Sequence, residues 1–262
     1  MKNIHFHKYQ GAGNDFIIID NRKGTFDGND TTLIEHLCNR RFGIGGDGLM
    51  LLENHPIHDF TMRYFNSDGG EASMCGNGGR CIAAFAVHKG VVSNPDKFSF
   101  MAVDGEHLAQ YKSGIVNLKM IDVNSVNEED KFTFLNTGSP HHVCFVDDVT
   151  KTDVYNEGKN IRYSERYQPD GTNVNFVQFK TGNKIKVRTY ERGVEDETLA
   201  CGTGVVASAI SAHLKKPSFS EFDIEVMGGK LKVCFEPDSE GGFKNVWLEG
   251  PATFVFEGTI EI

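Results

Sequence analysis

The tetrapeptide CGNG at residues 75–78 recurs as CGTG at residues 201–204, about half a chain length further on. Each copy runs into a segment that can form a helix, residues 80–89 in the first case and 205–216 in the second. A glycine follows the first segment and a proline follows the second, and helices commonly end at such residues. The repeat therefore predicts a tight turn that delivers a cysteine to a helix N-terminus, once in each half of the chain.

The segments around the two turns also repeat in order. A strand precedes each turn and its helix, and a hairpin and a further strand follow, the hairpins turning at residues 104–105 and 228–229. The polar stretch 124–130 separates the copies. We therefore predict an α/β (α+β) fold of two pseudo-symmetric lobes, residues 1–123 and 124–262, with the final strand returning to the N-terminal lobe. Each lobe is expected to be a mainly antiparallel sheet wrapped around a central helix, with the active site in the cleft between them.

Composition narrows the classes of function. The 262 residues carry a net charge of −9, which argues against nucleic acid or an anionic membrane as a partner. The N-terminal segment lacks the apolar core of a signal peptide, and no apolar run reaches the length of a membrane span, so we expect a cytoplasmic protein. Six cysteines in such a chain are expected to be thiols and not a disulfide framework.

Residues 43–48, GIGGDG, satisfy the pattern G-x-G-x-x-G of dinucleotide-binding loops. That pattern needs a strand before it and a helix after it. Here a predicted helix precedes the glycines and a predicted strand follows them. We therefore reject a dinucleotide site and expect a glycine-rich loop that shapes a pocket wall.

Two cysteines at helix starts suit one reaction in particular. Inversion of a stereocentre through its carbanion needs a base on one face and an acid on the other. A helix N-terminus lowers the pKa of a thiol, whereas repulsion between like charges resists ionising both thiols. One thiolate and one thiol, Cys75 and Cys201, would then share the proton transfers. Backbone donors at Gly76, Asn77, Gly202 and Thr203 would hold the substrate carboxylate and its developing charge.

At these residues the sequence resembles the diaminopimelate epimerase family of cofactor-independent amino-acid racemases. The resemblance covers almost the whole chain. It is carried by seven phrases in family order: GAGNDF at 11–16, RFGIGGDG at 41–48, FNSDG at 65–69, CGNGGRC at 75–81, Pro140-His141, YERG at 190–193 and ACGTG at 200–204.

The resemblance implies a function and a set of site residues. The reaction is the interconversion of LL- and meso-2,6-diaminopimelate in lysine and peptidoglycan biosynthesis, without pyridoxal phosphate, other cofactors or metal, by a homodimer. Cys75 and Cys201 would be the two bases, with His141 and Glu191 as further catalytic residues. The implied substrate contacts are Asn14, Asn66, Gly76, Asn77, Ser139, Asn173, Glu191, Arg192, Gly202 and Thr203.

Three departures from the family pattern concern the predicted site. Ser139 stands where the usual phrase has asparagine, which puts its contact with the substrate in doubt. Gly48 stands where some members have a glutamine that touches the substrate. One residue is inserted between Gly193 and Cys201, which predicts a differently shaped loop.

Other interpretations remain open at this point. A relative that acts on proline or hydroxyproline would carry the same cysteine turns, and a non-enzymatic dithiol redox sensor or binding protein would need no chemistry at carbon. A zinc site of Cys75, Cys81, His141 and His142 is disfavoured because no C-x-x-C pair occurs. The remaining histidines, His5 and His7 among them, are expected to be surface or hydrogen-bonded residues.

Overall fold

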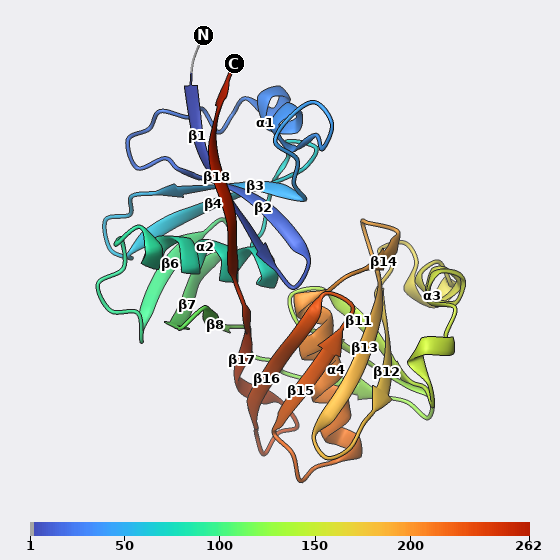
Figure 1. Cartoon of the computed structure of the whole chain (residues 1–262). Coiled ribbons are helices and arrows are strands. Elements are labelled where there is room, and N and C mark those ends of the chain that lie inside the picture. Colours follow the sequence, from blue (N-terminus) through green and yellow to red (C-terminus); the bar gives the residue numbers. More distant parts are fainter. Residues whose placement is uncertain (1–2) are drawn as a thin grey trace. The chain divides into compact units, whose positions relative to one another are not determined.

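The computed structural model describes residues 3–262, and its backbone contacts divide the chain into two compact units. Unit 1 comprises the chain up to Leu118 together with Gly250–Ile262, and unit 2 comprises Lys119–Glu249. The last strand, β18, runs beside the first strand, β1, in unit 1 (Figure 1).

Both units are mostly sheet with few helices. Unit 1 contains β1 (Asn3–Gly11), β2 (Asn14–Asp20), α1 (Thr31–Cys38), β3 (Gly48–Glu53), β4 (Phe60–Asn66), β5 (Glu71–Ala72), α2 (Gly76–His88), β6 (Phe98–Ala102), β7 (Gly105–Lys112), β8 (Ile115–Lys119) and β18 (Thr253–Glu261). Unit 2 contains β9 (Val126–Glu128), β10 (Phe132–Asn136), β11 (Pro140–Phe145), a 3-10 turn (Val149–Lys151), α3 (Val154–Arg162), a second 3-10 turn (Glu165–Tyr167), β12 (Asn173–Phe179), β13 (Lys184–Glu191), β14 (Asp196–Thr198), α4 (Gly202–Lys215), β15 (Glu221–Val226), β16 (Gly229–Pro237) and β17 (Phe243–Pro251).

The two sheets have the same topology. Unit 1 orders its strands β18-β1-β2-β3-β4-β6-β7-β8, and unit 2 orders them β9-β10-β11-β12-β13-β15-β16-β17. The third and fifth neighbouring pairs are parallel in each unit, and the other pairs are antiparallel. This match confirms the predicted α+β class with an internal repeat. The repeat begins earlier than the sequence indicated, because β1 and β2 correspond to β10 and β11.

Each sheet surrounds one helix. Helix α2 contacts β1, β2, β3, β7 and β18, and α4 contacts β10, β11, β12, β13, β15 and β16. Residues 76–86 of α2 are all buried, and so is α4 from Gly202 to Ala212 except for Thr203. Small side chains explain why both helices are buried on every face, since Gly, Ala and Ser let the surrounding strands approach closely. Arg80 is the one charged residue in these two buried stretches.

The glycine-rich segment lies between α1 and β3, in a helix–loop–strand context. The predicted helix–loop–strand context, on which the rejection of a dinucleotide site rests, is therefore confirmed. Helix α1 has Asp30 as its N-cap, with the Asp30 carboxylate accepting from Leu33 N at 3.0 Å. Helix α3, capped in the same way by Asp153, lies in a segment to which sequence reasoning assigned no element. No helix within residues 3–262 is both long and apolar enough to cross a membrane.

Candidate active site

Cys75 occupies the N-cap of α2, as the turn pattern predicts. Its backbone is extended (φ −99°, ψ 147°), and its Sγ accepts a hydrogen bond from Gly78 N at 3.2 Å. A Cβ at Gly78 would lie 3.1 Å from that sulfur, so a larger residue would crowd it. The half-buried sulfur therefore lies at the positive end of the helix dipole and already receives one backbone N–H.

A chain of side-chain amides extends from this turn. Arg80 donates to Asn77 Oδ1 at 2.8 Å, Asn77 Nδ2 donates to Asn14 Oδ1, and Asn14 Nδ2 donates to Asp47 Oδ2 at 2.9 Å. Because each donor has a fixed acceptor, the orientation of both amides is determined. The structure thus brings together the predicted residues Asn14, Gly76 and Asn77 beside Cys75.

Ion pairs fasten the glycine-rich loop to the same region. Asp15 pairs with Lys8 at 2.6 Å and with Arg40, and Arg40 also pairs with Asp47 at 2.7 Å. The Lys8 ammonium, which is buried, further donates to Gly45 O. Burial opposes ionisation of Asp15, but the hydrogen bonds from Arg40 and Lys8 outweigh it and lower the pKa of the carboxyl. Asp47, which orients Asn14, is therefore held by a charged network.

Arg80 is completely buried, yet it forms no ion pair with a carboxylate in the described chain. Its guanidinium donates to Gly76 O at 3.2 Å, to Asn77 Oδ1 and to Pro251 O at 3.5 Å. Burial lowers the pKa of Arg80, while the charges that Cys81 and Cys75 can carry raise it. Burial in turn raises the pKa of the Cys81 thiol to about 12, so Cys81 stays protonated.

Cys201 occupies the corresponding N-cap of α4 and is buried. Its Sγ lies 3.5 Å from Thr203 Oγ1. The turn requires a glycine at Gly204, directly after Thr203, because a Cβ there would lie 2.4 Å from Asn175 Oδ1. The second cysteine therefore also lies at the start of a helix, next to a hydroxyl.

His141 connects this hydroxyl to the sheet. Its Nε2 lies 2.9 Å from Thr203 Oγ1 and 3.0 Å from Ser139 Oγ. Its Nδ1 lies 3.0 Å from Asn175 Nδ2, whose own Oδ1 accepts from Thr189, so the amide must donate and Nδ1 must accept. The proton of the neutral ring is therefore on Nε2. Burial, helped by the charge of Arg192, lowers the pKa of His141 to about 3 and keeps the ring neutral.

Ser139, the residue that departs from the family pattern, lies within this cluster. Its hydroxyl is 3.1 Å from Thr203 Oγ1 and accepts from Asn173 Nδ2 at 3.2 Å. Asn173 also fixes the chain at Arg192, whose backbone N donates to Asn173 Oδ1 at 2.8 Å. Serine thus takes part in the local hydrogen bonds even though it is shorter than asparagine.

Glu191 and Arg192 stand at the end of β13. The Glu191 carboxylate accepts from Thr198 Oγ1 at 2.8 Å, and Thr198 belongs to β14, the strand formed by the segment in which the insertion falls. The half-buried Arg192 guanidinium donates to Asp170 O at 3.2 Å and forms no ion pair with a carboxylate of residues 3–262. Such a cation is suited to an anionic ligand.

Asn66 ends β4 opposite Gly48, and its side chain is exposed. A Cβ at Gly48 would lie 2.5 Å from Phe65 O, which explains why this chain has no side chain at that position. The predicted site residues thus fall into two groups. Cys75, Gly76, Asn77, Asn14 and Asn66 lie in unit 1, and Cys201, Gly202, Thr203, Ser139, His141, Asn173, Glu191 and Arg192 lie in unit 2.

Sequence reasoning missed the residues that orient these groups. Asn175 and Arg80 are both buried, and each holds a predicted site residue. Each carries a signal in the sequence. Asn175 is two residues from Asn173 and hence on the same face of a strand, and Arg80 is a charge in an otherwise apolar helix.

This chain is similar to known proteins both in sequence and in fold. The family model of diaminopimelate epimerase matches residues 6–126 and 133–255. A diaminopimelate epimerase of Flavobacterium psychrophilum is 52% identical over 259 residues, which cover 98% of this chain and 100% of that protein. Among solved structures, a PhzF-family phenazine biosynthesis protein of Bacillus anthracis has a TM-score of 0.80 at 14% identity, with both chains covered completely. A hydroxyproline epimerase of Agrobacterium vitis has a TM-score of 0.69 at 12% identity, over 98% of this chain and 92% of that one.

The two structural likenesses show a common fold, whereas the sequence matches cover almost the whole chain, and the ranges of the family model span both cysteine turns. The chain therefore belongs to the diaminopimelate epimerase family of amino-acid epimerases.

Proposed function

We propose that this protein interconverts LL- and meso-2,6-diaminopimelate, and that Cys75 and Cys201 act as the two bases on opposite faces of one α-carbon. The role belongs to lysine and peptidoglycan biosynthesis. The observation that carries the proposal is the repeated N-cap cysteine, at the start of a buried helix in each of two units of equal topology. The 52% identity to a protein named diaminopimelate epimerase supports the choice of substrate.

The chemistry requires one thiolate and one thiol. The thiolate removes the α-hydrogen from one face, and the thiol returns a hydrogen to the other face, after which the two sulfurs have exchanged protonation states. The carbanion adds negative charge to the substrate carboxylate. Backbone N–H groups at the starts of α2 and α4 are donors suited to that developing charge, since the first N–H groups of a helix have no intrahelical acceptor.

We assign the resting thiolate to Cys75. A fully buried guanidinium needs a negative charge nearby, and Arg80 has only amide and carbonyl acceptors among its direct contacts. Cys81 stays a thiol, which leaves Cys75 as the sulfur whose ionisation balances Arg80. Arg80 lies five residues after Cys75. The residue five positions after Cys201 is Val206, which carries no charge.

Recognition of the substrate is divided between charged and polar groups. Arg192 suits the distal carboxylate, because a guanidinium can bind a carboxylate through two parallel hydrogen bonds. Glu191, Asn14, Asn66 and Asn173 suit the ammonium groups. In this proposal His141 acts as a neutral donor through Nε2 and helps to position Thr203 beside Cys201.

Deuterium incorporation tests the proposal directly. LL-diaminopimelate is incubated with the enzyme and a thiol reductant in heavy water, and the α-carbon is examined by NMR and mass spectrometry. We expect deuterium at the α-carbon together with the meso isomer, and none in trans-4-hydroxy-L-proline or proline. Exchange into a proline substrate instead would establish the alternative epimerase activity. Reversible oxidation of the two thiols without exchange into any substrate would support a redox sensor.

We further propose a homodimer, the state that the family resemblance implies. Strand β18 supports this assignment, because Phe254, Val255 and Phe256 expose 43–50% of their surface along a strand that pairs only with β1 among the described strands. Sedimentation should give twice the chain mass of 29.1 kDa. A monomer at micromolar concentration would contradict this part of the proposal. The cytoplasmic location stays a prediction.

A further inference from the structure

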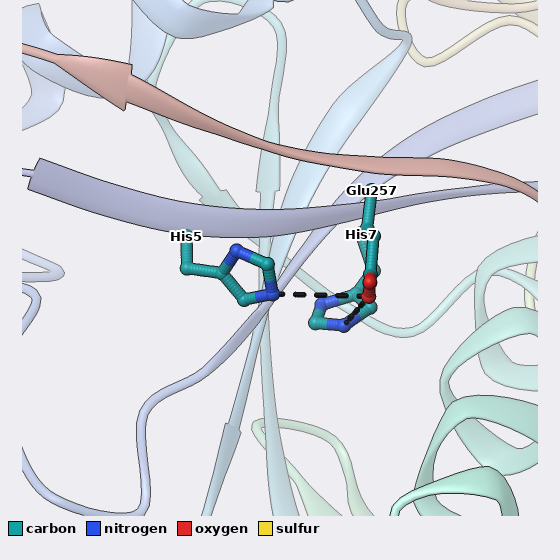
Figure 2. Close-up of side chains that lie close together, drawn as sticks. All are labelled: His5, His7 and Glu257. Atoms are coloured by element: carbon teal, nitrogen blue, oxygen red, sulfur yellow. Dashed lines mark ion pairs between the residues drawn. The ribbon is translucent and has the colours of Figure 1, made fainter.

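A cluster of three potential metal ligands lies in unit 1, on the pair of strands that joins the beginning and the end of the described chain. His7 on β1 stands directly opposite Glu257 on β18, and His5 is two residues earlier on the same face. Figure 2 shows both rings with a nitrogen turned toward the Glu257 carboxylate. Glu257 Oε2 lies 2.9 Å from His7 Nε2 and 3.8 Å from His5 Nε2.

His7 is the unusual member of this cluster. It is only 4% exposed and packs against the Phe85 ring of α2, yet neither ring nitrogen makes a hydrogen bond. Glu257 Oε2 faces His7 Nε2 at ion-pair distance, but the two atoms are not aligned for a hydrogen bond. His7 is therefore not a surface residue, and within the described structure its Nδ1 has no hydrogen-bond partner. A buried polar atom without a partner is costly, and such an atom indicates a missing ion or water.

The directions of these atoms suit a shared cation. A nitrogen and an oxygen that are close but not aligned can both direct lone pairs at a third point between them. Zinc lies ~2.0–2.2 Å from imidazole nitrogen and carboxylate oxygen, which places tetrahedral ligand atoms ~3.3 Å apart. The three ligand atoms lie within 4.8 Å of one another. The His5 and Glu257 side chains are each 54% exposed, so they can rotate to close the remaining gap.

The three side chains also indicate the kind of ion. Two imidazoles and one carboxylate form a ligand set that suits zinc and related transition ions better than Mg²⁺ or Ca²⁺, which prefer oxygen ligands.

We propose that His5, His7 and Glu257 bind one divalent transition-metal ion, for which zinc is the probe, and that this ion fastens β18 to β1. None of the three residues belongs to the proposed catalytic groups. The site would therefore act on the stability of unit 1, through the strand pairing that the ion bridges, and take no part in proton transfer.

The test is a calorimetric titration of the full chain with zinc, with magnesium as a comparison. Both proposed catalytic cysteines are changed to serine (Cys75→Ser and Cys201→Ser), because their thiols would compete for zinc. We expect one zinc per chain and no magnesium. His5→Ala and Glu257→Gln should each weaken zinc binding by at least about tenfold, the lower limit found even for loss of a supporting partner. Zinc should raise the Tm of the parent by more than it raises that of Glu257→Gln at the same concentration.

Matched variants control for general charge effects and for misfolding. Glu261→Gln removes another carboxylate from β18, and His36→Ala removes an exposed histidine of α1. Both should bind zinc as the parent does. With Co²⁺ as the probe, visible bands without thiolate charge transfer are expected. The proposal is overturned by no zinc binding, by equal weakening in Glu261→Gln, by thiolate bands, or by unchanged affinity in His5→Ala and Glu257→Gln with native circular dichroism.

Discussion

The two cysteine turns have one backbone design and two different surroundings. In unit 1 the turn is continued by a fully buried cation, Arg80, and a chain of amides that ends at Asp47. In unit 2 it is continued by hydroxyls and a neutral imidazole, Thr203, Ser139 and His141. The helix dipole acts on both sulfurs alike, so it cannot make them different. The difference must come from the side chains around them.

The repeat explains the architecture, and its divergence suits the proposed division of labour. The repeat places a cysteine at the N-cap of a buried helix in each unit. The proposed two-base reaction needs the two sulfurs to differ in protonation, and the proposal takes that difference from a charge in one unit against neutral donors in the other. The following predictions test this contrast, starting with the largest expected effect.

Replacing either sulfur by oxygen should remove most of the activity. In Cys75→Ser and Cys201→Ser, an alcohol that is far less acidic takes the place of the thiol. We expect kcat to fall by about 10²–10⁴-fold in each variant, the usual contribution of a positioned acid–base group. Cys234→Ser in β16 is the matched control and should keep its activity. Activity within twofold of the parent in either site variant would exclude the two-thiol mechanism.

Arg192 should act on the substrate and not on a thiol, unlike Arg80. Arg192→Leu removes a charge-assisted contact worth about 1.5–3 kcal/mol, so KM for diaminopimelate should rise by about 10–100-fold with a smaller change in kcat. Arg166→Leu removes a different exposed guanidinium of unit 2, one that pairs with Glu129, and should leave KM unchanged. A fall in kcat at constant KM would place Arg192 elsewhere in the mechanism.

Arg80→Met should reduce the thiolate character of Cys75 alone. Loss of the buried charge should slow alkylation of Cys75 by iodoacetamide at neutral pH by about tenfold and move its pH profile up by about one pH unit. Peptide mapping separates Cys75 from Cys201, whose rate should not change and which serves as the internal control. Arg80→Lys should restore much of the rate. Equal slowing at both cysteines would mean that Arg80 acts through the fold.

The neutral histidines of unit 2 should make it sensitive to mild acid. Burial lowers the pKa of His141 to about 3 and that of His142 to about 4, so below pH 6.5 the unfolded chain binds more protons than the folded one. The free energy of unfolding should therefore fall as the pH drops from 6.5 toward 4. Urea titrations followed by fluorescence of the single tryptophan, Trp247, report on unit 2. His142→Gln should show a shallower fall, and an unchanged slope would contradict the assignment.

The regular elements could be predicted to the extent that their signals are local. The cysteine turns, the helices after them and the hairpin at residues 104–105 follow from glycines, caps and alternation within a few residues. Helix α3 was not predicted, since its sequence is polar and its stability depends on Tyr190 and other core residues of distant strands. The sequence pattern alone cannot show that Arg80 hydrogen-bonds to Asn77 or that Asn175 hydrogen-bonds to His141. Tertiary contacts decide which partner a buried polar group finds.

The pairing of β1 with β18 has a consequence for the order in which the protein can form on the ribosome. Asn3 lies opposite Glu261, so β1 gains its outer neighbour only after the whole segment of unit 2 has been synthesised. Unit 2 is contained in one continuous segment and can fold as soon as that segment has emerged. Unit 1 keeps an open strand edge at β1 until β18 has emerged as well.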